Sequence, residues 1–126
     1  MNSKVAKELL HIQSWLSIAS VIVAQGHDHY VADNVAQEAG DSLLIKLGEA
    51  AKRLATHGVE APKDVDWSDA AKTREKIAHH YSVIDREMTW MTLSVSLPQW
   101  QDALAPLFDE ASAALGLAEG KRKRTE

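Results

Sequence analysis

Apolar residues recur every three or four positions along most of this chain, and this spacing predicts α-helices. The first stripe lies within residues 5–24 and consists of Val5, Leu9, Ile12, Leu16, Ala19 and Val23. Gly26 can end this helix, because glycine readily adopts the left-handed conformation of a helix C-terminus. A second helix is predicted to begin at Asp33 or Asn34, whose side-chain oxygens can cap it, and to run to about Thr56.

Further stripes complete the pattern. Asp66 or Ser68 can start a third helix, and Asp85 can cap a fourth that reaches Leu97. Pro98 is expected to begin a new helix rather than to continue the preceding one. No segment alternates with period two for long enough to predict a strand. The expected fold is therefore all-α, a mainly antiparallel bundle of four to five helices.

Composition limits the organisation and the class of protein. The chain has 126 residues, of which 45% are hydrophobic, enough for one core. Residues 1–118 are expected to form a single domain, and residues 119–126 a basic, solvated, disordered tail. There is no cysteine, so a disulfide or a thiolate metal site is excluded. The absence of a signal-peptide pattern or a spanning segment favours a cytoplasmic protein without membrane contact.

The most specific pattern lies in residues 72–81. Arg74, His79 and Tyr81 form the spacing R-x4-H-x-Y there. Further matches to one family stand in order on both sides, at residues 30–33, 47–54, 65–67, 83–85, Trp90 and 97–98. In this combination the chain resembles the HepT-like toxins of the HEPN ribonuclease superfamily, over roughly residues 30–98.

The resemblance implies a function. HepT-like proteins are metal-independent RNA endonucleases, so we expect an HEPN-like helical domain, an RNA substrate, no cofactor and no metal. They act as homodimers that hold both motifs in one cleft. They also serve as the toxin component of a toxin–antitoxin system, whose partner is a minimal nucleotidyltransferase antitoxin. Transfer of AMP to Tyr81 by such a partner would add negative charge beside the RNA site and block the substrate.

The residue types suit RNA cleavage by attack of a ribose 2′-hydroxyl on the adjacent phosphate. Histidine titrates near neutrality, so His79 is assigned as general acid or base. Arginine stays protonated and offers a planar fork to phosphate oxygens, so Arg74 is assigned as the phosphate clamp. On a straight helix, however, His79 points about 140° away from Arg74, whereas Tyr81 lies within about 20° of it. We therefore expect either a loosened helix near His79 or a site shared by two subunits.

One position departs from the family. Asn, Asp or His usually follows the motif arginine, but this chain has Glu75. Its carboxylate is expected to repel a phosphate unless it points away or pairs with Lys72 or Lys76. His80 is a possible auxiliary residue, because it fits a spacing one residue longer. The alternative function is a nucleotide-binding or dimerisation module that keeps the HEPN scaffold with weak or no cleavage, favoured by Glu75 and by the net charge of −4.

Each motif residue also has a purely structural interpretation: Arg74 as a surface ion pair, the histidines as partners of a helix dipole, Tyr81 as a core aromatic. Elsewhere, His27-Asp28-His29 offers imidazole and carboxylate groups, but adjacent residues rarely converge on one ion, so a solvated loop is expected. Gly48 lies inside the second predicted helix, where glycine costs stability relative to alanine. It predicts a close approach of another helix at that point.

Overall fold

The structure, a computed structural model, describes residues 1–79 and 83–117, and every regular element within these ranges is helical. The elements are α1 (Ser3–Ala24), α2 (His27–Ala32), α3 (Asn34–Thr56), α4 (Trp67–His79), α5 (Arg86–Met91), the π-helical segment η2 (Thr92–Ser96) and α6 (Leu97–Ala114). Because α5, η2 and α6 follow one another without a gap, they form one long helical run. The described chain thus contains four long helices and the short α2, and the all-α prediction is confirmed.

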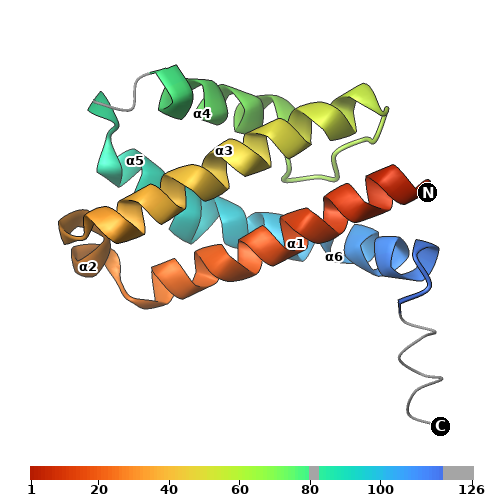
Figure 1. Cartoon of the computed structure of the whole chain (residues 1–126), viewed down its shortest axis with the longest axis horizontal. Helices are drawn as coiled ribbons and strands as arrows, with labels where there is room; N and C mark the ends of the chain where they lie inside the picture. Colours follow the sequence, from red (N-terminus) through yellow and green to blue (C-terminus); the bar gives the residue numbers. More distant parts are fainter. Residues whose placement is uncertain (80–82, 118–126) are drawn as a thin grey trace, which may run out of the picture.

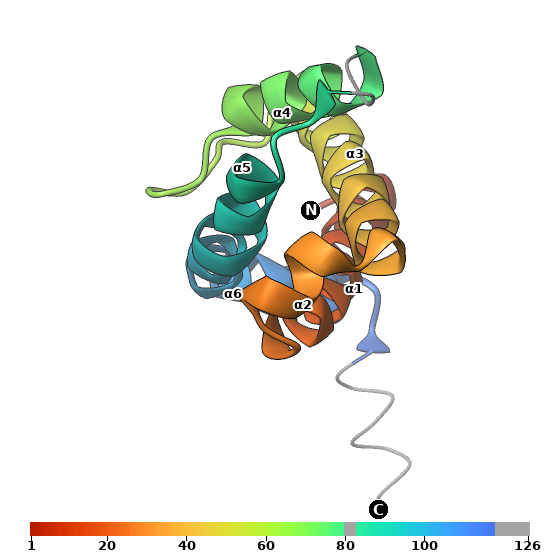
Figure 2. The same ribbon diagram turned by 90° about the vertical axis from the view of Figure 1, so that its left-hand side faces the viewer.

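The long helices pack as antiparallel neighbours. α1 packs against α3 and α6, and α3 packs along its other side against α4 (Figure 1). Seen end-on, the four surround a common centre, with α4 above, α3 on one side and the α5–α6 run on the other (Figure 2). α4 shares far more contacts with α3 than with the α5–η2–α6 run. The helix that carries the motif is therefore held mainly by a single neighbour.

The apolar stripes meet in one core. Its fully buried large side chains are Leu9, Ile12, Tyr30, Leu47, Leu54, Ile77, Leu93 and Leu104. They come from α1, α2, α3, α4, η2 and α6, so each element buries its own stripe against the others. Burial of one such side chain contributes about 1.5–3 kcal/mol, which makes this shared core the main stabilising term.

Three of the predicted caps are confirmed. Asp33 accepts a hydrogen bond from the backbone N–H of Val35 at 3.0 Å, at the start of α3. Asp66 accepts from the first turn of α4, and Asp85 accepts from the first turn of α5. Each carboxylate satisfies backbone donors that a helix start leaves without partners.

Two local predictions are wrong. His27-Asp28-His29 is not a loop but the first half of α2, because the buried Tyr30 anchors this polar turn on the core. Gly26, with φ at 95°, turns the chain directly from α1 into α2. Pro98 does not follow a break either. In η2 the N–H of Leu97 donates to the carbonyl of Thr92, five residues back, and this wider turn lies directly before Pro98 in the first turn of α6.

Two predicted features lie outside the described residues: the tail at residues 119–126 and the segment 80–82 that follows α4. Within the described ranges, no helix combines the length and the apolar character needed to cross a bilayer.

Candidate active site

Arg74 and His79 lie on the second half of α4, and the carboxylate between them joins them. Arg74 Nη1 donates to Glu75 Oε1 at 2.7 Å, and His79 Nε2 lies 2.9 Å from Glu75 Oε2. The exposed fractions of the side chains are 27% for Arg74, 49% for Glu75 and 66% for His79. The three residues therefore form one charged cluster, which we call the Arg-Glu-His cluster, and His79 is its most accessible member.

Gly48 sets the position of Arg74. A Cβ built on Gly48 would lie 2.2 Å from Arg74 Cβ and 2.7 Å from the carbonyl oxygen of Ala70. Atoms do not approach so closely, so only glycine permits this crossing of α3 and α4. The close helix approach predicted at Gly48 is confirmed, and the helix that it brings close is the one that carries the motif.

A second carboxylate touches the arginine from α3. Arg74 Nη2 lies 3.6 Å from Glu49 Oε1, and Glu49 also lies 4.0 Å from Arg53. Arg53 in turn forms an ion pair with Glu8 on α1, with 2.7 Å between Nη2 and Oε1. Alternating charges thus link α1, α3 and α4 and fix the guanidinium of Arg74 from the side of the bundle. Glu49 was not singled out from the sequence, although it stands in the family-like segment 47–54.

The electrostatics of the cluster keep its carboxylate charged. The hydrogen bond from Arg74 lowers the pKa of Glu75 below its ordinary value, and the charges of Arg74 and His79 act in the same direction. An ionised carboxylate only accepts hydrogen bonds, so the proton of the His79 contact belongs to Nε2. In the neutral ring, Nδ1 is then the nitrogen left to accept a proton. Glu75 therefore neither points away nor pairs with Lys72 or Lys76, the two alternatives considered from the sequence, because its described partners are Arg74 and His79.

Arg74 is more constrained than a surface ion pair would be. Its Nε atom is buried and has no hydrogen-bond partner among the residues that the structure describes. A buried donor without a partner costs about 1–3 kcal/mol, so folding alone does not favour an arginine here. This observation weighs against the purely structural interpretation of Arg74.

Arg74 and His79 are joined although they point in different directions from α4. α4 remains helical through His79, so no loosening brings the two residues together. Glu75 instead lies about 100° from Arg74 and about 40° from His79 around the helix, and a long guanidinium side chain spans the larger gap. One subunit can therefore join the arginine and the histidine. His80 and Tyr81 lie outside the described residues.

His27, in the segment considered for a metal, has other partners. Its Nδ1 lies 3.1 Å from Asp28, and its Nε2 lies 2.7 Å from Glu87 on α5. The hydrogen bonds to Asp28 and Glu87 raise the pKa of His27 above its ordinary value. Within residues 1–79 and 83–117, no group of three or more potential ligands is arranged to hold a metal ion.

The fold and the cluster together define an all-helical protein that presents an arginine and a histidine near the end of a helix. The chain belongs to the HepT-like ribonuclease family, whose model, "Ribonuclease HepT-like", matches residues 12–107. It is also 33% identical over 63 residues to "Putative RNase MJ0127" of Methanocaldococcus jannaschii. That alignment covers 50% of this chain and 52% of the other protein, so the chain spans about half the length of the curated relative that it matches. No solved structure matches this one.

Proposed function

We propose that this chain is a metal-independent RNA endonuclease that acts through Arg74 and His79. The observation that carries the proposal is the Arg-Glu-His cluster, in which Glu75 holds an obligate cation and a titratable imidazole at the accessible end of α4. Phosphate-ester cleavage needs a stabiliser of negative charge and a group that moves a proton, and these two side chains supply them. Membership of the HepT-like ribonuclease family supports the same reaction.

In the proposed reaction, Nδ1 of His79 takes the proton of a ribose 2′-hydroxyl, and the resulting oxygen attacks the adjacent phosphorus. The bond from phosphorus to the 5′-oxygen breaks, which leaves a cyclic phosphate and a 5′-hydroxyl. Arg74 neutralises the added charge on the non-bridging oxygens. A second acid must protonate the leaving oxygen, and His79 of a second copy supplies it in a two-fold homodimer.

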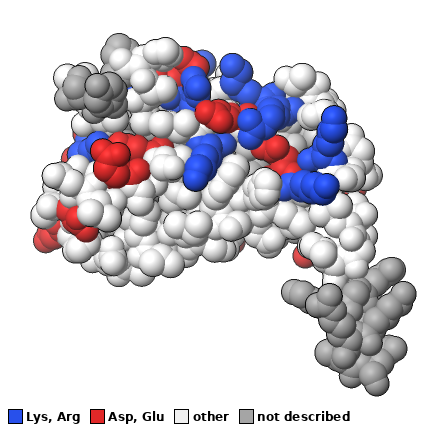
Figure 3. All heavy atoms as spheres, viewed as in Figure 1, with Lys and Arg blue, Asp and Glu red and all other residues white. Residues whose placement is uncertain are grey.

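Only part of the protein surface carries the positive charge that a polyanionic substrate needs. The net charge of the chain is −4, so attraction to RNA must come from a patch. Lys and Arg side chains gather over α3 and α4, interleaved with acidic ones, whereas much of the remaining surface in this view is uncharged (Figure 3). The charged surface over α3 and α4 is therefore mixed rather than purely basic.

The first test is RNA cleavage by purified protein in a buffer with a metal chelator. We expect His79→Ala and Arg74→Ala each to lower the cleavage rate by roughly a hundredfold or more. Gln13→Ala, an exposed change on α1, is the control and should retain activity. If both cluster variants stay folded and cleave as fast as the wild type, the assigned site is wrong.

We further propose that the protein is a toxin controlled by AMP transfer to Tyr81, two residues after His79 in the sequence. An AMP group would carry a phosphate next to the site and repel the RNA. Co-expression with a minimal nucleotidyltransferase should raise the intact mass by whole AMP units and abolish growth arrest. Tyr81→Phe should remove the mass increase and remain toxic. An unchanged mass of the wild-type protein would contradict this mode of control.

A second candidate function follows from Glu75. Because its carboxylate already binds Arg74 Nη1 and His79 Nε2, it competes with a phosphate for both groups. The chain would then be a nucleotide-binding or dimerisation module on the same scaffold. Lack of cleavage by the unmodified wild type, together with cleavage by Glu75→Asn, would favour this candidate over the first.

A further inference from the structure

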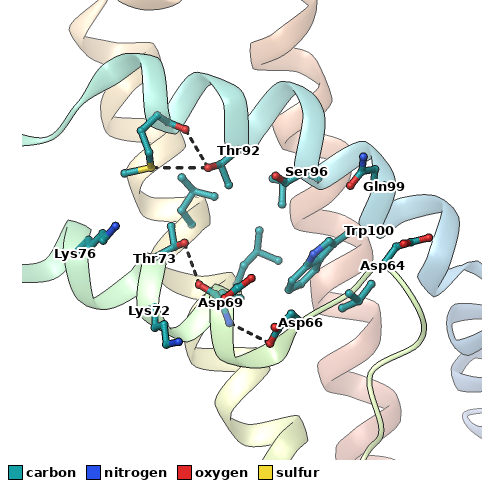
Figure 4. Close-up of a pocket in the computed structure, with 16 residues that line it drawn as sticks. Asp64, Asp66, Asp69, Lys72, Thr73, Lys76, Thr92, Ser96, Gln99 and Trp100 are labelled. Carbon is teal, nitrogen blue, oxygen red and sulfur yellow. Dashed lines mark hydrogen bonds between the residues drawn. The ribbon is translucent and has the colours of Figure 1, made fainter.

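A groove with a volume of about 610 Å³ runs between α4 and the α5–η2–α6 run, with residues of α3 at its base (Figure 4). One wall is α4 with the preceding loop, and the other is the α5–η2–α6 run. The groove exists because α4 packs mainly on α3 and meets the opposite run at its first residue, Trp67, which contacts Trp100. Its volume lies within the range of about 300–1,000 Å³ that is typical of small-molecule sites.

The floor of the groove is apolar, and its far wall carries uncharged polar groups. Leu44, Leu47, Leu97 and Trp100 form the floor, and all four are buried. Trp100 is held by an edge-to-face contact with Trp67, with ring centroids 5.5 Å apart. Thr92, Ser96 and Gln99 stand above the floor on the far wall. An apolar floor that includes an aromatic side chain, with hydrogen-bonding groups beside it, can hold an unstacked nucleobase.

The wall formed by α4 connects the groove to the candidate active site. Lys72 and Lys76 line the groove, and both are exposed. Lys72, Lys76 and His79 lie within about 60° of one another around the helix, so they form a single stripe. Neither lysine has an acidic partner within 4.0 Å in the described part of the chain, in contrast to Arg74. A phosphate chain at His79 can therefore continue along the two lysines and reach the groove.

The opposite end of the groove has the reverse charge. Asp64 and Asp66 lie there, and Asp69 lies between them and Lys72 on α4. Carboxylates repel phosphates, so the RNA backbone cannot continue past this end. They do accept hydrogen bonds from ribose hydroxyls. The charge pattern thus fits a nucleotide whose phosphate faces the lysines and whose sugar faces the aspartates.

We propose that this groove binds the base and ribose of one unpaired nucleotide of the RNA, next to the phosphate that is cleaved. The proposal rests on the proposed RNA endonuclease function and adds the substrate class, since a base held in a duplex cannot enter the groove. A helix of a partner protein is the competing occupant. The charged groups at both ends of the floor favour a ligand that is itself charged at one end and hydroxylated at the other.

The test is a titration of the isotope-labelled full chain with 5′-mononucleotides, followed by NMR. We expect saturable shifts of the Trp100 indole N–H and of the Ser96 and Gln99 amides, while the Trp15 indole on α1 stays unchanged. Shifts confined to residues near Arg74 and His79, or no shifts at millimolar nucleotide, would overturn the proposal. The second result would leave a partner helix as the better occupant.

Two variants separate the groove from the chemistry. Ser96→Trp fills the groove from the far wall, and Ser17→Trp adds the same bulk on the exposed face of α1. Ser96→Trp should abolish the nucleotide shifts and raise the KM for single-stranded RNA roughly tenfold with little change in kcat, and Ser17→Trp should do neither. Unchanged KM in a cleaving Ser96→Trp enzyme overturns the groove but not the endonuclease. If the wild type does not cleave RNA, that function fails, and the nucleotide titration alone decides whether the groove binds.

Discussion

Replacement of Gly48 by alanine tests the link between helix packing and the candidate site. The new methyl group would lie 2.2 Å from Arg74 Cβ and 2.7 Å from the Ala70 carbonyl, and both obstacles belong to α4. Carbon atoms are stable at about 3.5–4.0 Å, so α4 must move away from α3 by more than about 1 Å. Arg74 moves with it, because its own Cβ is the nearest obstacle.

Two effects of opposite sign determine the stability of this variant. Alanine inside a helix gains about 1 kcal/mol over glycine. Overpacking of a tight contact costs about 1–3 kcal/mol, and the involvement of backbone atoms places Gly48→Ala at the upper end. We expect a net loss of about 1–2 kcal/mol, which corresponds to a melting temperature roughly 3–8 °C lower. A displacement of about 1 Å at Arg74 can also reduce cleavage about a hundredfold in protein that is still folded.

Gly40→Ala provides the control on the same helix. The atoms nearest to its added Cβ would be Leu93 Cδ1 at 3.0 Å, the far end of a flexible side chain, and Tyr30 Cε1 and Oη at 3.5 Å. The free energy of unfolding should therefore stay within about 1 kcal/mol of the wild type. The assays are thermal unfolding followed by circular dichroism and RNA cleavage well below both melting temperatures. If Gly48→Ala is as stable and as active as Gly40→Ala, the close crossing does not position Arg74.

Three further changes probe other charged contacts. The hydrogen bond from Arg74 lowers the pKa of Glu75, so the stability that ionised Glu75 contributes is fully present above pH 4.5 and is lost as the pH falls through the lowered pKa. The difference in melting temperature between the wild type and Glu75→Gln should therefore close in acid. The pKa of His27 is raised, so the pH dependence is reversed: the stability that protonated His27 contributes is fully present below pH 6.5 and is lost as the pH rises through the raised pKa. The difference in melting temperature between the wild type and His27→Gln should therefore shrink in alkaline buffer. Arg86 binds Asp41 through two bonds of 2.7 and 3.0 Å in a largely buried site. Asp41→Asn should lower the free energy of unfolding by about 2 kcal/mol in denaturant titrations, and an unchanged value would show that the pair contributes nothing net.

Local rules in the sequence were enough for the long helices and for the starts of α3, α4 and α5. Asp33, Asp66 and Asp85 act as caps because a short carboxylate reaches backbone donors only two or three residues away. Gly48 could be interpreted for a similar reason, since a helical glycine without a nearby helix end costs stability and needs a packing explanation. These features depend on residues that are close in the sequence, so the sequence alone is enough to predict them.

The geometry of the site depends on side-chain reach and on distant segments. A helical wheel treats each side chain as a short radial vector, so it placed Arg74 and His79 apart and missed the bridge through Glu75. Glu49 is 25 positions before Arg74 and meets it only because α3 and α4 cross there. The groove requires α4 to pack on one side and η2 to bring Thr92 and Ser96 onto the facing wall. None of these follows from periodicity.

The one-sided attachment of α4 has a thermodynamic consequence. A helix held along a single edge can detach at a lower free energy than the rest of the bundle, so its amides should exchange with solvent before those of α1 and α3. A molecule that fills the groove would contact α4 and the α5–η2–α6 run together and would raise that local opening free energy. Order at Arg74 and His79 would then rise with occupancy of the groove, and a substrate would help to assemble the site that cleaves it.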